Sequence, residues 1–106
     1  MSLEEKALQN DMAAYMRGEQ PPAEQLTAAP RLSGWVATIT RGPSGEYEMT
    51  LIGRATGHPY LLDGKDATTS PILWLDRKGR WARSQNRLWK LGEPAGEEVP
   101  IDGVDA

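Results

Sequence analysis

Helix-breaking residues near the N-terminus confine the helical part of this chain to a short arm. Ser2 followed three residues later by Glu5 has the form of a capping box, and apolar residues at helical spacing follow it. Gly18 ends this pattern, and the two prolines after it cannot continue a helix, because proline lacks an amide hydrogen and clashes with the preceding turn. We therefore predict a helix over residues 3–17 and a short helical turn over residues 23–28.

Beyond this arm, the chain consists of short β-type segments separated by glycine and proline. Residues 34–40 are rich in β-branched side chains, and residues 47–52 alternate apolar and polar side chains as a half-buried strand does. The glycines and proline of residues 41–46 favour a hairpin between them. Residues 59–62 are predicted as a short third strand. Together these segments predict an α+β fold, in which the N-terminal helix packs on a small antiparallel sheet of about four strands.

The clearest local prediction is a turn at Asp76-Arg77-Lys78-Gly79. Aspartate at the first position and glycine at the fourth suit a type I turn closed by a glycine bulge. This turn joins residues 72–75 to residues 80–83, and the resulting hairpin would place Leu75 opposite Trp81.

The segment Arg77–Lys90 is strongly basic. It contains six of the twelve Lys and Arg residues, two of the four Trp residues and no acidic residue. If the strand after the turn stays extended, alternation places tryptophan and arginine side chains on one face. This predicted interaction surface consists of Trp81, Arg83, Arg87 and Trp89. The segment also has apolar residues at helical spacing, with Gly92 in the position of a C-cap, so a helix is the alternative.

The two tryptophans of this segment have two interpretations. On the surface, they and the arginines would form a platform on which bases stack and phosphates bind. In the core, they would supply bulk to a chain that has no phenylalanine, with the arginine stems lying along the rim. The solvent accessibility of both rings decides between these interpretations.

The length of 106 residues is that of a single domain, and we expect one compact α+β domain over residues 1–92. Residues 93–106 are acidic and are predicted to form a flexible tail, with docking of Val99–Ile101 over the basic strand as the alternative. The chain has no cysteine and no long apolar run, so we predict a cytoplasmic protein that does not enter a membrane. The formal net charge of −3 argues against a general nucleic-acid binder.

A candidate small-ligand site centres on His58, which is the only histidine. Asp63, Thr69 and Ser70 lie near it in the sequence, but no Gly-x-Ser-x-Gly elbow accompanies them. The simpler interpretation is that a His58 ring nitrogen and the two hydroxyls satisfy local backbone groups. One histidine and no cysteine offer few zinc ligands, and residues 63–66 lack the carboxylate spacing of a calcium loop. We therefore predict no catalytic residue, no metal and no cofactor.

Four short motifs follow one another between Leu32 and Gly92. They are Gly57-His58-Pro59 with Leu61, then Thr68-Thr69-Ser70, then Trp81-Ala82-Arg83, then Arg87-Leu88-Trp89-Lys90-Leu91-Gly92. In this order they resemble a family of small uncharacterised proteobacterial proteins, a domain of unknown function. The resemblance implies a bacterial source and a single compact domain, and it supplies no activity, ligand or catalytic residue.

Three functions from different classes are compatible with these observations. The leading hypothesis is a non-enzymatic binding or adaptor module for a protein partner, or for a second copy of itself, because exposed tryptophan and arginine are frequent energetic anchors of interfaces. The second is single-stranded nucleic-acid binding through the Trp and Arg side chains of Arg77–Lys90. The third is a small metabolite binder or enzyme centred on His58.

Overall fold

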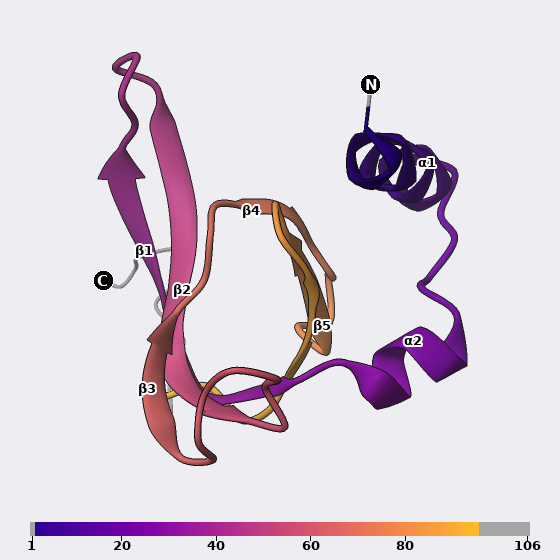
Figure 1. The fold of residues 1–106 in the computed structure, drawn as a ribbon. Coiled ribbons are helices and arrows are strands. Elements are labelled where there is room, and N and C mark those ends of the chain that lie inside the picture. The colour runs from indigo at the N-terminus through magenta and orange to yellow at the C-terminus, as the bar shows by residue number, and fades with distance from the viewer. Residues whose placement is uncertain (1, 96–106) are drawn as a thin grey trace.

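A computed structural model describes residues 2–95 as two helices and a six-stranded sheet (Figure 1). The elements are α1 (Leu3–Met16), α2 (Ala23–Ala28), β1 (Arg31–Arg41), β2 (Tyr47–Thr56), β3 (Lys65–Thr68), β4 (Ile72–Leu75), β5 (Trp81–Ser84) and β6 (Leu88–Leu91). The predicted α+β class is confirmed. The predicted sheet of about four antiparallel strands is wrong, because the sheet has six strands and is mixed.

The strand order is β3-β2-β1-β6-β5-β4, so two three-stranded meanders meet at β1 and β6. β1 and β6 run parallel, with Arg31 opposite Lys90 and Leu32 opposite Leu91, whereas the other neighbouring strands are antiparallel. The sheet curves strongly, so that β1–β3 and β4–β5 face each other across the molecule (Figure 1). The linker between β3 and β4 is bonded to β2 through Thr69, whose amide donates to the Leu51 carbonyl at 2.9 Å.

The long β1–β2 hairpin predicted from the sequence is confirmed, and its tip projects beyond the rest of the fold (Figure 1). The strand predicted over residues 59–62 is wrong: these residues lie in a loop, and the third strand is β3. Pro59 cannot donate to a sheet ladder, and β2 continues to Thr56 before the chain leaves the sheet.

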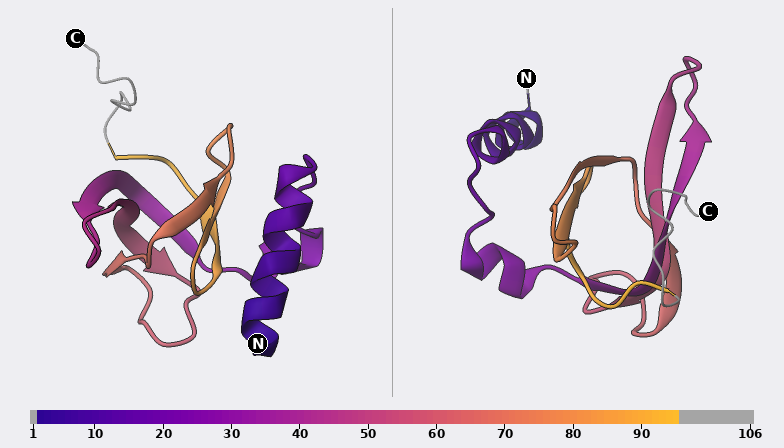
Figure 2. Two further views of the ribbon diagram at one scale, coloured as in Figure 1. Left: turned by 90° about the horizontal axis from the view of Figure 1, so that it is seen from above. Right: turned by 180° about the vertical axis from the view of Figure 1, so that it is seen from behind.

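Helix α1 begins at the predicted capping box, in which the Ser2 hydroxyl accepts from the Glu5 amide and the Glu5 carboxylate accepts from the Ser2 amide. It ends before Gly18, which has a φ of 90° that glycine adopts without the steric cost of a side chain. The helix lies on the outer side of β4 and β5, away from the β1–β2 hairpin (Figures 1 and 2). Tyr15 is its only buried residue.

Two groups of apolar side chains lie on opposite faces of the C-terminal meander. The inner cluster fills the concave side of the sheet and consists of Leu32, Trp35, Leu51, Ala55, Ala67, Ala82, Trp89 and Leu91. The outer cluster lies under the helices and consists of Tyr15, Trp81 and Leu88, with Met12, Leu26, Ala29 and Trp74 packed against it. The helices and the concave side of the sheet are therefore stabilised by separate apolar contacts.

The predicted turn at residues 76–79 is confirmed. The Gly79 amide donates to the Asp76 carbonyl at 2.9 Å, and Gly79 has a φ of 69°. The predicted register is wrong by one residue next to the turn, where Leu75 lies opposite Ala82 and Trp74 lies opposite Arg83; an irregularity between Ile72 and Trp74 then pairs Ile72 with Ser84. Because neighbouring side chains on a strand point to opposite faces, Leu75 shares a face with Ala82 and not with Trp81.

The segment after Trp81 is neither one continuous strand nor a helix. It forms two short strands, β5 and β6, which reverse direction between Ser84 and Arg87. The Ser84 hydroxyl stabilises this reversal, because it donates to the Arg87 carbonyl at 3.1 Å and accepts from the Arg87 amide at 3.3 Å.

The acidic C-terminal segment enters the described structure only over its first residues. The Glu93 carbonyl accepts from the Gly34 amide at 2.7 Å, and the Ala95 amide donates to the Trp35 carbonyl at 2.9 Å. The rest of the tail predicted over residues 93–106, including Val99–Ile101, lies outside the described residues. Within residues 2–95, no helix is long and apolar enough to cross a membrane.

Candidate functional site

The two tryptophans of the predicted interaction surface are buried, each with 3% of its surface exposed. They also lie on opposite faces of the sheet. Trp81 pairs with Lys90 and packs in the outer cluster, whereas Trp89 pairs with Ala82 and packs in the inner cluster. The prediction of one aromatic and arginine face is therefore wrong, and bases have neither ring to stack on.

Arg83, the first arginine of that surface, holds α1 against the sheet. Its guanidinium donates to the Asp11 carboxylate at 2.7 Å and to the Ser84 carbonyl at 3.0 Å. Tyr15 packs beside this ion pair, and burial raises the pKa of its hydroxyl, with the nearby Asp11 charge adding to the effect and Arg83 opposing it. The charge of Arg83 therefore stabilises the contact between α1 and β5.

Arg87 belongs to a different environment, beside the loop formed by residues 57–64, which we call the Tyr60 loop. The Arg87 guanidinium lies over the Tyr60 ring, 5.9 Å from its centroid, within the range of a cation–π contact. The His58 ring lies 5.8 Å from the Tyr60 ring and 5.6 Å from the buried Trp89 ring. The structure therefore brings His58, Arg87 and Trp89 together, although the sequence placed them in two separate candidate sites.

Hydrogen bonds to the backbone hold the Tyr60 loop in one shape. His58 Nδ1 accepts from the Tyr60 amide at 3.0 Å, and the Asp63 carboxylate accepts from the Gly57 amide at 2.9 Å. The Gly64 amide donates to the Ala55 carbonyl at 2.8 Å, which ties the end of the loop to β2. The predicted backbone role of the His58 ring is confirmed.

The pKa of His58 is lowered, first because partial burial disfavours the charged imidazolium and second because the Arg87 charge repels it. A neutral His58 keeps a lone pair on Nδ1, which is what the bond from the Tyr60 amide requires. The shift and the hydrogen bond therefore favour the same protonation state.

The remaining two residues of the candidate small-ligand site also satisfy backbone groups. Thr69 Oγ1 accepts from the Leu51 amide at 3.0 Å, and Ser70 Oγ accepts from the Asn86 amide at 3.2 Å. Two surface cavities of the described part are lined by other residues. Within residues 2–95, no group of three His, Cys, Asp or Glu side chains could hold a metal ion. His58 and Asp63 therefore hold the Tyr60 loop, whereas Thr69 and Ser70 tie the linker between β3 and β4 to β2 and to Asn86.

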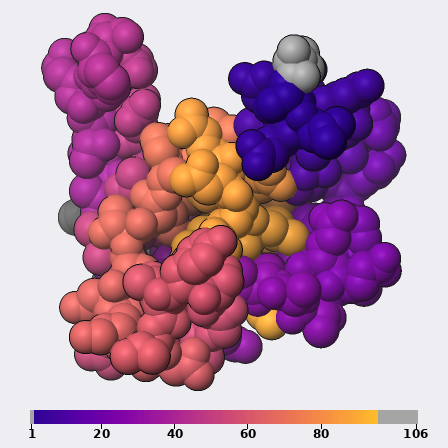
Figure 3. Space-filling view, viewed as in Figure 1, coloured from indigo at the N-terminus to yellow at the C-terminus, as the bar shows by residue number. Residues whose placement is uncertain are grey.

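The Tyr60 loop presents large apolar side chains to solvent. Tyr60 is 82% exposed and Leu62 is 75% exposed, and Arg87 lies half-buried beside them. Residues near position 60 stand out at the lower front of the molecule in the space-filling view (Figure 3). The strand predicted over residues 59–62 does not indicate this surface, although proline at its start and Asp63-Gly64 after it are also typical of a loop.

Comparisons with known proteins place the chain in a family but supply no activity. No curated protein and no solved structure matches the chain. A family model described as "Family of unknown function (DUF6634)" matches residues 3–99, which is most of the chain. This agrees with the resemblance to an uncharacterised family seen in the motifs between Leu32 and Gly92. The chain therefore belongs to the DUF6634 family.

Proposed function

We propose that the protein is a non-enzymatic binding module that recognises a partner protein through the Tyr60 loop. The observation that carries this proposal is the exposure of Tyr60 and Leu62 beside Arg87. Tyrosine and arginine are enriched among the residues that dominate interface energies, and large apolar side chains left in water on a folded scaffold are typical of such surfaces.

The internal bonding of the Tyr60 loop supports a binding role. A loop that is already ordered loses less conformational entropy when it binds, so more of its contact energy appears as affinity. Bonds from the Gly57, Tyr60 and Gly64 amides order this loop without covering the Tyr60 ring.

The charge beside the loop indicates the chemistry of the partner. Arg87 has no carboxylate partner among the ion pairs of the described residues, whereas Arg83 and Arg80 each have one. We therefore propose a partner surface with an apolar patch for Tyr60 and Leu62 and an acidic side chain for Arg87. The geometry does not favour the single-stranded nucleic-acid hypothesis, because Trp81 and Trp89 are buried.

Photo-crosslinking from position 60 in the native cell tests this proposal. A photoreactive phenylalanine analogue at Tyr60 should give one dominant cross-linked protein, and the same analogue at Tyr47, an exposed tyrosine on the β1–β2 hairpin, should not. The cross-linked protein is then purified and titrated with the unlabelled chain. A product of twice the chain mass would identify the partner as a second copy.

Alanine variants then separate the loop from the rest of the surface. Tyr60→Ala and Arg87→Ala should each weaken the measured affinity by roughly tenfold or more, as expected of interface anchors. Arg77→Ala removes the same charge from the exposed β4–β5 turn and should leave affinity within about twofold. Equal affinity for the native chain, Tyr60→Ala and Arg87→Ala would refute the proposal.

A further inference from the structure

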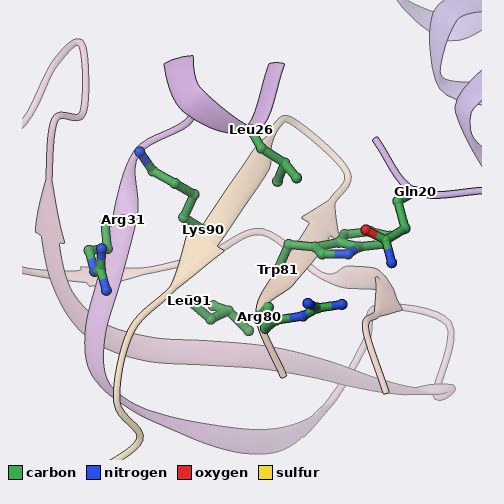
Figure 4. A pocket seen from close by; sticks show the side chains of 7 residues that line it. All are labelled: Gln20, Leu26, Arg31, Arg80, Trp81, Lys90 and Leu91. Carbon is green, nitrogen blue, oxygen red and sulfur yellow. The ribbon is translucent and has the colours of Figure 1, made fainter. Parts of the chain in front are cut away.

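A groove with an apolar floor lies between α2 and the ends of β5 and β6 (Figure 4). Its volume is about 280 Å³, and it is lined by Gln20, Leu26, Arg31, Arg80, Trp81, Lys90 and Leu91. At the ~30 Å³ that a water molecule occupies in the liquid, this space accommodates roughly nine non-hydrogen atoms. The groove therefore has room for a small molecule.

The rim of the groove carries three positive charges and no negative one among its lining residues. Lys90 Nζ donates to the Thr27 carbonyl at 3.1 Å, so an ammonium group, with three donors, retains others for a ligand. The Arg80 guanidinium contacts Asp76 only through Nε, at 3.5 Å, and the Arg80 side chain is 57% exposed. Arg31 is exposed at the opposite side of the groove (Figure 4). The rim favours an anion.

The floor contributes an unusual polar group. The indole Nε1 of Trp81 is buried and has no hydrogen-bond partner among the described residues. A buried N–H without a partner costs about 1–3 kcal/mol, so an acceptor that reached it would be bound favourably. The exposed Gln20 side chain lines the groove together with Trp81 (Figure 4), and we expect a ligand to displace it on reaching the indole N–H.

We propose that this groove binds a small carboxylic acid with a compact apolar body, such as an aromatic or short-chain monocarboxylate. The apolar body packs on Leu26, Leu91 and the Trp81 edge. The carboxylate lies at the cationic rim and accepts the Trp81 N–H. This site is separate from the Tyr60 loop, and neither Tyr60 nor Arg87 lines it.

Nuclear magnetic resonance of the ¹⁵N-labelled full chain tests the site, with benzoate as the probe. Benzoate should shift the Trp81 indole N–H signal in a saturable manner and leave the Trp89 indole signal in place. Trp89 Nε1 is also buried and has no hydrogen-bond partner within residues 2–95. Trp81→Phe and Trp89→Phe assign the two signals. Benzamide has the same shape without the charge and should bind at least fivefold more weakly.

Matched variants test the cationic rim. Arg80→Gln should raise the dissociation constant of benzoate by roughly five- to tenfold, because charge-assisted hydrogen bonds are the stronger ones. Arg77→Gln makes the same charge change in the same turn, but Arg77 does not line the groove. This variant should leave the dissociation constant of benzoate within twofold of the native value. Equal binding of benzamide and benzoate, equal losses in the two arginine variants, or an unmoved Trp81 signal would each overturn the proposal. Binding of inorganic phosphate at these residues without benzoate binding would overturn it as well.

Discussion

Replacing Tyr15 with alanine should detach α1 from the sheet. Tyr15 is 4% exposed, and its ring lies 4.9 Å from the Trp81 ring and 5.9 Å from the Trp74 ring. It is the only buried residue of α1, and the helix also contacts the sheet through the Asp11–Arg83 ion pair and through Met12, which packs against the outer cluster. Tyr15 is therefore the α1 side chain that buries the most surface in this contact.

The magnitude follows from the area that Tyr15 buries. An aromatic side chain buries roughly 150–250 Å². At about 25 cal/mol per Å², this corresponds to ~4–6 kcal/mol, which is an upper bound because the unfolded chain already buries some apolar surface. We expect a loss of about 3 kcal/mol in the free energy of unfolding, the lower end of the range for aromatic-to-alanine changes in cores. A domain of this size should then melt roughly 10–20 °C lower.

Urea unfolding measures the loss, and amide hydrogen exchange locates it. In Tyr15→Ala, the amides of α1 should lose protection while those of β2 keep theirs, because β2 is held by the inner cluster and by its strand partners. Met16→Ala is the matched control: Met16 is 75% exposed on the same turn, so its change should stay within about 0.5 kcal/mol. A loss below about 1 kcal/mol in Tyr15→Ala, or equal losses in both variants, would refute the account of how α1 docks.

Substitutions at His58, Arg87, Gly53 and Thr69 probe the sheet and the Tyr60 loop. His58 should have a pKa below the usual value of about 6.5. Arg87→Gln should raise the pKa of His58 only part of the way back to this value, because burial, the larger cause of the shift, remains. Proton NMR measures the pKa of His58 in both proteins. Because the pKa of His58 is lower in the folded than in the unfolded chain, the unfolded chain binds the proton more readily. The free energy of unfolding should therefore decrease as pH falls from about 6.5 through the folded pKa of His58. His58→Gln should remove this part of the pH dependence, as measured by urea titrations at several pH values. Gly53→Ala should cost about 1–3 kcal/mol in thermal unfolding, because an added Cβ would lie 2.8 Å from a backbone carbonyl oxygen of β1; an unchanged melting temperature would contradict this packing. Thr69→Val should cost about 1–3 kcal/mol by leaving the buried Leu51 amide without its acceptor, whereas Thr69→Ser keeps the acceptor and should cost less in the same assay.

The elements that local chemistry determines were predictable from the sequence. The capping box at Ser2 and the break at Gly18 bound α1 almost to the residue. Aspartate and glycine at the two ends of the β4–β5 turn likewise specified that turn. Each of these signals involves residues only a few positions apart, so the interactions depend on local sequence and not on the tertiary fold.

The faces of β5 and β6 could not be predicted in this way. Arg80 lies in the turn instead of the strand, since the Asp76 amide bonds to the Trp81 carbonyl, and Leu75 consequently lies opposite Ala82 and not opposite Trp81. The reversal after Ser84 has no glycine or proline to mark it, because a serine hydroxyl stabilises it. The prediction that Trp81 and Trp89 form an interaction surface was therefore wrong. Of the four predicted residues, only Arg87 lies beside the Tyr60 loop that we propose as the binding site.

The exposure of the Tyr60 loop is also a tertiary property. A short apolar run after proline is compatible with a buried strand or an exposed loop, and the difference depends on where β2 ends and what β3 pairs with. The hydrogen bond between the His58 ring and the backbone was predictable because its donor, the Tyr60 amide, is only two residues away in the chain.

The parallel contact between β1 and β6 has a consequence for how the protein folds. All other neighbours in the sheet are consecutive in the chain, so each meander can assemble from hairpins that close within microseconds. Joining Arg31 to Lys90 instead requires the closure of most of the chain into one loop, and contacts of such long sequence separation slow the folding of small domains. The encounter of these two strands is therefore the step that we expect to limit the refolding rate, and the inner cluster can be completed only after it.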